Sequence, residues 1–371
     1  MIKKIVFKNY KAFKEEQMLE LRPVTLLIGK NSSGKTSLCN LVHMLSQALS
    51  TPKDEDLTIL ENVDPFVMGG GNLFHKGDYT SMAIKGYNEQ NMFFHVDYIH
   101  SNGQTYLAAF DTQEGNVITV DEEIRTRIYN SLRGAIKYTG MDTRQFAFTV
   151  NHIGPIRDFK SSLMKDMGYN PTEVDRKGRM AYDMLINSYE QDTSLYRNVA
   201  AWFRDNLEGQ EIHISPISMV DSRYYFISVA PFNIGIEHVG EGFRQVLPVI
   251  VETYNENASD VTIIEQPALH LHPAAHAAIM HRIAESAKQL NRQYVIESHS
   301  ENMLLELRRM VSDPQSNLNP EDVIIYYVDM IEGVSFLKPI YISAEGELSF
   351  WPTGVFGEGF EILSKIMKNR S

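Results

Sequence analysis

Apolar and polar residues follow a strand, turn and helix pattern at the start of the chain. Residues 2–8 alternate partly, as in a strand with one covered face, whereas Val24–Ile28 is an uninterrupted apolar run. From Lys35 to Leu49, leucines and a valine recur at helical spacing. This order predicts a buried strand, a turn over residues 29–35 and an amphipathic helix.

Four β-rich segments separated by turns with Asn and Gly occupy residues 79–120. Short apolar runs with such turns between them are typical of neighbouring strands that reverse direction. We therefore expect an antiparallel meander built from Met82–Ile84, Met92–Val96, Tyr106–Phe110 and Val117–Val120.

The middle of the chain, from about residue 121 to 210, is mixed and more helical. Helices are expected at Gly178–Leu185 and Tyr196–Leu207. No heptad pattern is sustained, which argues against a long coiled-coil arm. Trp202, in the second helix, is either a packed core residue or a contact for a partner protein.

The β pattern returns after about residue 211, and strands then alternate with helices. The apolar strand Val261–Ile264 precedes a helix that begins at Pro273, and Tyr294–Ile296 precedes a second helix around Leu304. Alternation of this kind predicts a mostly parallel sheet.

Composition places the chain among ordinary globular proteins, with 43% hydrophobic and 22% charged residues. No apolar stretch approaches the ~20 residues needed to cross a bilayer, and the N-terminus lacks a signal-peptide pattern, so we expect no membrane contact and a cytoplasmic location. The single cysteine, Cys39, excludes an internal disulfide and a Cys-rich zinc site, and is expected to pack inside its helix. With 35 basic against 47 acidic residues, the net charge of −12 disfavours nucleic-acid binding over the whole surface but leaves room for a local basic patch.

The strongest chemical signal is the segment Gly29–Thr36, which matches G-x-x-x-x-G-K-[ST] between a predicted strand and a predicted helix. Glycines let successive backbone N–H groups turn toward a phosphate, and the helix start adds a positive dipole end. Lys35 is expected to reach the β- and γ-phosphates of ATP, and Thr36 to ligate Mg²⁺. The ATP-binding residues expected in this P-loop are Gly29, Asn31, Ser32, Ser33, Gly34, Lys35, Thr36 and Ser37.

A second site with a carboxylate lies far along the chain. Val261–Glu265 is an apolar strand that ends in an acid, as a Walker B residue must in order to hold Mg²⁺ beside a P-loop. The next predicted strand ends in Glu297–Ser300, so His299 is expected at a strand end beside the Walker B strand.

The series of motifs resembles the SMC/RecF branch of the ABC-type ATPases. Besides the P-loop and the Walker B strand, the resemblance rests on Phe7–Phe13, Ile153–Arg157, Val239–Pro248, Gln266–Pro273, Glu297–Glu301 and Leu348–Gly354. More narrowly, the series is similar to defence-associated AAA family ATPases related to the OLD (overcoming lysogenization defect) and Septu PtuA proteins. The resemblance implies an α/β ABC-type P-loop NTPase head, with an antiparallel β lobe and a helical insertion, that binds ATP and Mg²⁺ between two copies of itself.

The resemblance also implies roles for single residues. The turn at residues 240–245 would stand where the ABC signature loop stands, against the γ-phosphate of the ATP on the partner's P-loop. His299 would be the switch histidine at the γ-phosphate, and His272 would occupy the D-loop position. The catalytic group would be Glu265, Gln266 and His299, with Mg²⁺ held by Thr36 and Glu265. The signature residues expected to contact nucleotide are Gly240, Glu241, Gly242, Arg244 and Gln245.

Two positions depart from the pattern of the family. Gln266 stands where many ABC-type ATPases carry a glutamate that polarises the attacking water, and Ala268 replaces a glutamate common in the family. An amide can orient a water but cannot accept its proton, and general-base catalysis contributes about 10²–10⁴-fold. We therefore expect tight ATP binding with slow turnover.

Some polar positions leave alternatives open. No metal site is expected at His270, His272, His276 and His281, because no acidic or Cys ligand is placed with them. Arg157 is equally compatible with a sensor near the nucleotide and with a salt-bridged structural residue. The Q-loop residue is expected within Asn72–Gly77.

The P-loop and the Walker B strand must join one sheet, so we expect one ATPase head split along the chain. Residues 1–125 would carry the P-loop and the β lobe, and residues 126–210 a mainly helical insertion. Residues 211–371 would carry the signature-like turn, the Walker B strand, the D-loop and the switch histidine.

Three functions are compatible with these features. The first is an ATP-gated homodimer, or higher even oligomer, that regulates a separately encoded effector, a nuclease or a toxin, because no Asp-x-Asp nuclease pair follows the last ATPase motif. The second is a RecF- or SMC-like ATPase that binds DNA. A P-loop kinase is the third, but it leaves the turn at 240–245 and His299 unexplained. The acidic net charge favours a protein effector over DNA. The basic residues that support DNA binding are Lys3, Lys4, Lys8, Lys11, Lys14, Arg308 and Arg309, for which a solvated edge strand and a helix C-terminus are the alternative reading.

Overall fold

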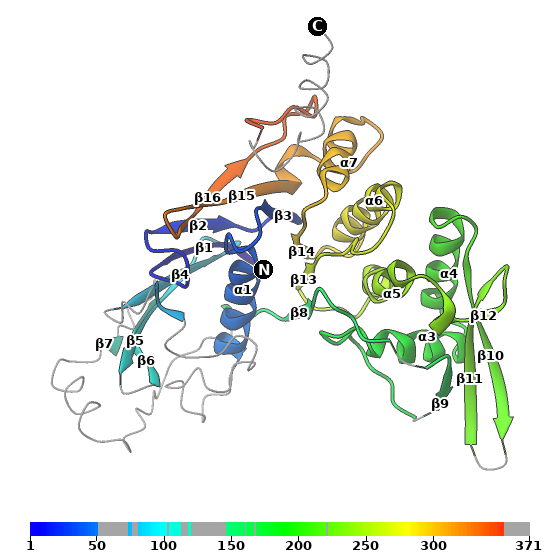
Figure 1. Ribbon diagram of the computed structural model, residues 1–371. Coiled ribbons are helices and arrows are strands. Elements are labelled where there is room, and N and C mark those ends of the chain that lie inside the picture. Colours follow the sequence, from blue (N-terminus) through cyan, green and yellow to red (C-terminus); the bar gives the residue numbers. More distant parts are fainter. Residues whose placement is uncertain are drawn as a thin grey trace, which may run out of the picture. The chain divides into compact units, whose positions relative to one another are not determined.

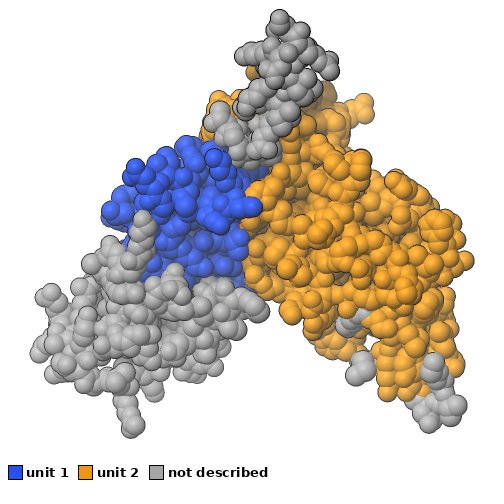
Figure 2. Space-filling model, in the orientation of Figure 1, with its two compact units in different colours: residues 1–22, 27–150, 324–340 blue, residues 23–26, 151–323, 341–371 orange. Residues whose placement is uncertain are grey.

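The computed structural model describes residues 1–50, 73–75, 81–101, 104–112, 118–119, 146–159, 161–166, 168–219 and 222–351. The chain forms two compact units (Figure 2). Unit 1 comprises residues 1–22, 27–150 and 324–340, and unit 2 comprises residues 23–26, 151–323 and 341–371. These boundaries differ from the division at residues 125 and 210, so the roles assigned to those three segments stay predictions.

Unit 1 contains an antiparallel sheet of β1 (Ile2–Lys8), β2 (Gln17–Glu20), β4 (Met82–Asn88), β5 (Phe93–Ser101), β6 (Gln104–Thr112) and β7 (Ile118–Thr119), in the order β2-β1-β4-β5-β6-β7 (Figure 1). The predicted meander is confirmed by the antiparallel pairs β4–β5, β5–β6 and β6–β7. Val117 and Val120 lie outside the described residues. Because β1 has a neighbour on both sides, the expectation that its lysines lie on an edge strand is wrong.

The predicted strand, turn and helix around the P-loop are confirmed. β3 (Val24–Gly29), whose last three residues belong to unit 1, leads through the turn into α1 (Lys35–Ser50). The apolar stripe of α1 is buried, and Cys39 packs inside with it. In the sheet order of this unit, β3 is followed by β15 (Val323–Ile331) and β16 (Val334–Ile340), which form an antiparallel hairpin.

Unit 2 contains the strand expected to carry the Walker B acid. Residues 24–26 of β3 are followed in sheet order by β14 (Gln293–Glu297), β13 (Val261–Glu265) and β8 (Val150–Ile153). β13 and β14 are parallel and every residue in them is buried, as the uninterrupted apolar runs predict. α6 (Pro273–Gln289) and α7 (Glu301–Ser312), each of which follows one of these strands, confirm the predicted alternation.

The rest of unit 2 combines helices with a second antiparallel sheet. α3 (Met180–Glu190) and α4 (Ser194–Asn206) match the two predicted helices, and α4 packs on α5 (Glu241–Tyr254) through the rings of Phe203 and Phe243, 4.4 Å apart. The described part of the predicted insertion also contains β9 (Leu163–Lys165), a strand that the sequence pattern does not indicate. The sheet consists of β10 (Glu211–Met219), β11 (Ser222–Ala230), β12 (Ile234–Gly235) and β9, which pairs with β11.

The helices of the described ranges include none whose length and apolar character would let it span a bilayer.

One acidic side chain lies fully inside unit 2. Glu252, in the last turn of α5, is 0% exposed and accepts hydrogen bonds from Thr262 Oγ1 at 3.5 Å and Asn255 Nδ2 at 3.4 Å. Burial raises the pKa of Glu252 to about 7, despite the Arg292 guanidinium 3.9 Å away.

This raised pKa predicts a pH dependence of stability. The folded protein holds the Glu252 proton more firmly than the unfolded chain, so the stabilisation is complete below pH 4.5 and is lost as the pH rises through 7. The Glu252→Gln variant cannot ionise, so we expect its stability relative to wild type to improve by about 3 kcal/mol between pH 4 and pH 8. Urea unfolding at both pH values measures this change. Glu256→Gln, at a nearby exposed position, is the matched control. An equal Glu252→Gln effect at both pH values would contradict the prediction.

Candidate functional site

In unit 1 the P-loop closes around its own lysine. The Lys35 side chain is 3% exposed, and its Nζ donates to the backbone carbonyl oxygens of Gly29 at 3.0 Å and Lys30 at 2.7 Å. Thr36, the next residue, is exposed at the start of α1. The loop therefore places an ammonium group and a hydroxyl at the N-terminus of a helix, as phosphate and Mg²⁺ binding require.

The two motif glycines are required by the packing of unit 1. A Cβ at Gly29 would collide with the carbonyl oxygen of Val328 in β15. Gly34 has φ +107°, and a Cβ there would lie 3.1 Å from the ring of Phe13. Between them Ser32 has φ +62°, and Ser335 Oγ donates to the Ser33 carbonyl oxygen at 2.7 Å. The sequence motif is thus matched by a tightly supported loop.

The N-terminal motif Phe7–Phe13 supports the same loop. Tyr10 is fully buried, its pKa is raised by burial, and its hydroxyl donates to the Ser37 carbonyl oxygen at 3.0 Å. Of the segment expected to hold the Q-loop, the structure describes residues 73–75, where His75 Nδ1 lies 3.0 Å from the Lys11 carbonyl oxygen. The Q-loop assignment stays a prediction.

In unit 2 the three residues expected to be catalytic lie at one edge of the sheet. Glu265 is paired with Glu297 in the β13–β14 register, and the Gln266 N–H donates to the Glu297 carbonyl oxygen at 2.8 Å. His299, which is exposed, lies two residues after the end of β14 and directly before Ser300, the N-cap of α7, whose Oγ accepts from the Met303 N–H at 3.3 Å. Glu265, Gln266 and His299 therefore gather at the carboxyl ends of two adjacent parallel strands.

The Walker B carboxylate has two partners that the sequence reasoning missed. His152 Nε2 lies 2.8 Å and Arg176 Nη2 3.2 Å from Glu265 Oε1, and Arg176 Nη1 lies 2.8 Å from His152 Nδ1. His152 directly precedes the resembling segment Ile153–Arg157, and this position is the signal that the sequence offers. Arg176 lies between β9 and α3, in a stretch without a sequence motif, so only the folded structure reveals its contact with Glu265.

The signature-like turn is hydrogen-bonded to the end of the Walker B strand through Arg157. The Arg157 N–H donates to Gln245 Oε1 and Gln245 Nε2 donates to the Arg157 carbonyl oxygen, both at 2.9 Å. Arg157 Nη2 donates to the Glu265 carbonyl oxygen at 2.6 Å. Burial lowers the pKa of Arg157 to about 9, while the charge of Glu265 opposes that shift, so the guanidinium stays charged at neutral pH. Of the two alternatives for Arg157, these contacts favour the structural one.

The two glycines of this turn differ in their surroundings. Gly240 is the residue before α5, with φ −56° and ψ 147°, and no described atom lies within 4 Å of the position of a Cβ. A Cβ at Gly242 would lie 2.5 Å from the His270 carbonyl oxygen, in the segment after the Walker B strand. A side chain at position 240 would thus have room, whereas the packing of unit 2 requires glycine at position 242. Glu241 forms an ion pair with Arg244 and accepts from Gln245 Nε2 at 2.7 Å.

His272 and His276, in and beside the segment expected to form the D-loop, make local hydrogen bonds. His272 precedes α6, and its Nδ1 accepts from the Ala274 N–H at 3.3 Å. His276 lies 2.7 Å from Ser300 Oγ and 3.1 Å from the Leu271 carbonyl oxygen. Among the described residues, no group of three or more His, Cys, Asp or Glu side chains is arranged to hold a metal ion.

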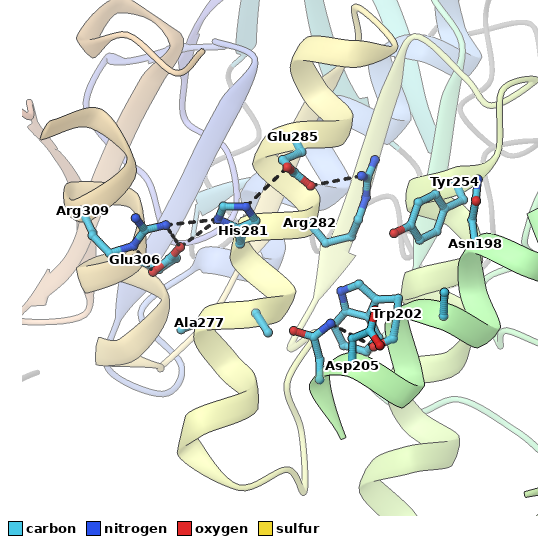
Figure 3. Close-up of a pocket in the computed structure, with 13 residues that line it drawn as sticks. Asn198, Trp202, Asp205, Tyr254, Ala277, His281, Arg282, Glu285, Glu306 and Arg309 are labelled. Carbon is cyan, nitrogen blue, oxygen red and sulfur yellow. Dashed lines mark hydrogen bonds and ion pairs between the residues drawn. The ribbon is translucent and has the colours of Figure 1, made fainter. Parts of the chain in front are cut away.

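A pocket of about 520 Å³ between α4, α6 and α7 contains none of the motif residues (Figure 3). His281 contacts Glu285 at 3.4 Å and Glu306 at 2.9 Å, and these carboxylates raise the pKa of His281 to about 9. The charged side chains that line the pocket on α6 and α7 therefore pair with one another. Trp202, on the α4 side, is only 7% exposed and packs on Phe203, which favours a packed residue over a partner contact.

Comparisons with known proteins agree with this geometry. Residues 1–162 match a family model described as AAA ATPase domain, residues 232–306 match an AAA domain model described with the AbiEii toxin and type IV TA systems, and residues 318–365 match a protein family of unknown function, DUF3696. A crystal structure of the Smc head bound to the C-winged helix domain of ScpA is 14% identical, with a TM-score of 0.55 over 92% of this chain and 98% of that chain. Two segments of this chain are thus similar to AAA ATPase domains, and the chain has an SMC-head-like fold.

A second SMC head gives the same result. The Smc head domain with an extended coiled coil, bound to the C-terminal domain of ScpA and derived from Pyrococcus furiosus, is 13% identical, with a TM-score of 0.51 over 99% of both chains. No curated protein matches the sequence. The SMC-head-like fold confirms the expected α/β P-loop NTPase with antiparallel β lobes. The narrower likeness to OLD and PtuA proteins stays a prediction.

The contrast between Gly240 and Gly242 predicts unequal losses of stability from the same substitution. Gly242→Ala forces a methyl group against the His270 backbone, and overpacking of this kind costs about 1–3 kcal/mol. We expect Gly240→Ala to cost less than about 1 kcal/mol, the usual loss when alanine takes a cap position. Urea unfolding of both variants measures the difference. Equal stability of the two variants would show that the packing of Gly242 is not as described.

Proposed function

We propose that this chain is an ATPase head that dimerises around ATP, hydrolyses it slowly and regulates a separately encoded effector, a nuclease or toxin, in bacterial anti-phage defence. The AAA ATPase domains imply ATP binding and hydrolysis. Beyond ATP binding and hydrolysis, we propose that two copies pair when ATP is bound, that hydrolysis is slow and that the dimer regulates an effector.

The observation that carries the proposal is the Arg157 bridge. In an ATP-bound dimer, the signature-like turn of one copy would face the nucleotide on the P-loop of the other. Arg157 joins that turn, through Gln245, to the backbone of Glu265 and Gln266 in the same copy. Contact of the turn with the partner's nucleotide can therefore bias the position of the residues expected to be catalytic.

The residues expected to bind Mg²⁺ have the chemistry that the ion prefers. Thr36 offers a hydroxyl and Glu265 a carboxylate, and both are hard oxygen donors. The two belong to different compact units, so their sharing of one ion is part of the proposal. Bound Mg²⁺ would neutralise charge on the β- and γ-phosphates. Lys35 would exchange its two carbonyl partners for phosphate oxygens, and Gln266 and His299 would orient water and the γ-phosphate.

Two observations support a role in defence with a protein effector. The model matched by residues 232–306 is described with a toxin and with TA systems. The narrower resemblance to OLD and PtuA proteins points the same way, and the net charge of −12 disfavours DNA as the main partner.

The alternative, a DNA-binding ATPase like RecF or SMC, draws on the SMC-head-like fold and on exposed Lys3, Lys8 and Lys14. Two other basic residues proposed for DNA are engaged elsewhere. Arg308 Nε donates to the Gly346 carbonyl oxygen at 2.7 Å, and Arg309 forms an ion pair with Glu306 at 2.7 Å. We therefore favour the protein effector.

ATP-dependent pairing is tested at Gly240, where a new side chain has room in the single copy. Aspartate and serine are both good helix caps, so Gly240→Asp and Gly240→Ser are expected to fold as wild type does. Only Gly240→Asp places a negative charge where the partner's γ-phosphate would lie. We expect sedimentation with ATP to show dimers for wild type and Gly240→Ser and monomers for Gly240→Asp. Monomeric wild type with bound ATP would contradict the proposal.

Slow hydrolysis is tested at Gln266. The Gln266→Glu variant supplies a base where the wild type has an amide, and we expect its ATP turnover to rise at least 10-fold, within the range of general-base effects. We expect wild-type turnover below the roughly 10 s⁻¹ typical of enzymes. Phosphate release under saturating ATP measures both rates. Gln266→Ala is the control for lost water orientation, and unchanged turnover in Gln266→Glu with normal ATP binding would count against the assigned role.

A further inference from the structure

We propose that His152 and Arg176 are positioning residues for the Walker B carboxylate, which hold Glu265 Oε1 and leave Oε2 directed to a divalent cation. This inference rests on the proposed function, because it takes Glu265 to be a metal ligand. It assigns a task to two residues that the motif series does not include.

Both donors converge on the same carboxylate oxygen. His152 Nε2 lies 2.8 Å and Arg176 Nη2 3.2 Å from Oε1 of Glu265, and both of these contacts are to Oε1 rather than Oε2. The His152 side chain is 2% exposed and that of Glu265 is 4% exposed. A buried carboxylate held by two donors at one oxygen has little freedom to rotate, so the direction of its second oxygen is set.

The contact between Arg176 and His152 fixes the imidazole tautomer. A guanidinium can only donate hydrogen bonds, so Arg176 Nη1 donates to His152 Nδ1, which must accept. The imidazole proton then resides on Nε2, where it is donated to Glu265. The three side chains are thus linked to one another by three contacts, each of which joins a donor to an acceptor.

The backbone holds both donors in place. His152 lies on β8, which is next to β13 in the sheet order, and Glu265 is the last residue of β13. The Arg176 carbonyl oxygen accepts from the Gly154 N–H at 2.9 Å, so the segment that carries Arg176 is tied to the residue that follows β8. The close approach is possible because Gly154 has no side chain, since a Cβ there would lie only 3.3 Å from that oxygen.

The chemistry of metal sites gives the expected size of the effect. Side chains that orient a metal ligand usually account for 10–100-fold in metal affinity when they are removed. Arg176 also balances the charge of a buried carboxylate, which is costly to keep unpaired. Loss of either residue is therefore expected to weaken metal binding more than it weakens metal-free nucleotide binding.

The test measures Mn²⁺ as a spectroscopic probe, using the full chain. Free Mn²⁺ is followed by electron paramagnetic resonance in the presence of a non-hydrolysable ATP analogue. A fluorescent ATP analogue in EDTA reports nucleotide binding without metal. His152→Leu removes both hydrogen bonds at similar volume. His152→Gln keeps an amide donor and a carbonyl acceptor, and His281→Leu removes a histidine elsewhere in unit 2 as the matched control.

We expect His152→Leu to weaken Mn²⁺ binding about 10–100-fold and to leave metal-free nucleotide binding within about twofold. His152→Gln and His281→Leu should stay close to wild type. Arg176→Met, at a side chain that is 25% exposed, gives a second variant if His152→Leu does not fold. Unchanged or tighter Mn²⁺ binding in a folded His152→Leu or Arg176→Met variant would overturn the inference. Failure of wild type to bind nucleotide would instead overturn the proposed function.

Discussion

The arrangement of unit 2 depends on one buried cation. Arg157 is 3% exposed, and its guanidinium donates to backbone carbonyl oxygens of Gln245 and Glu265. A buried charge is costly unless it is hydrogen-bonded, and here Nη1 and Nη2 make such bonds while Nε has no partner among the described residues. Because its acceptors lie at the end of β13 and in the first turns of α5, Arg157 fixes the spacing between two motifs that are far apart in the sequence.

Lys35 in unit 1 and Arg157 in unit 2 both donate to backbone carbonyl oxygens, but the two sites differ in where those oxygens lie. Lys35 is held by the carbonyl oxygens of Gly29 and Lys30, which belong to its own loop. Carbonyl groups carry only partial charge, so a phosphate oxygen competes with them more easily than it would with a carboxylate. Arg157 is bound across elements, by acceptors that a ligand does not replace. The same kind of acceptor thus gives an exchangeable site in one unit and a fixed joint in the other.

The sequence predicted those parts of the fold that have a strong local cause. The apolar runs Val24–Ile28 and Val261–Ile264 became fully buried strands, and the helix that follows the first of them buries its predicted apolar stripe. The roles of individual side chains were harder to predict. That Gly242 faces a carbonyl oxygen while Gly240 faces open space depends on packing, not on spacing. Likewise β9 is only three residues long, and it is a strand because β11 pairs with it.

β3 has a consequence for how the chain can fold during synthesis. Its first residues belong to unit 2, where the Tyr294 N–H donates at 2.9 Å to the carbonyl oxygen of Pro23, the residue before β3. In unit 1, Ser335 Oγ holds the P-loop that follows it. Both units therefore need partners that are translated some 270 to 300 residues after β3. Contacts so distant in sequence form slowly, so the P-loop strand lacks these partners until residues 294 and 335 have been synthesised.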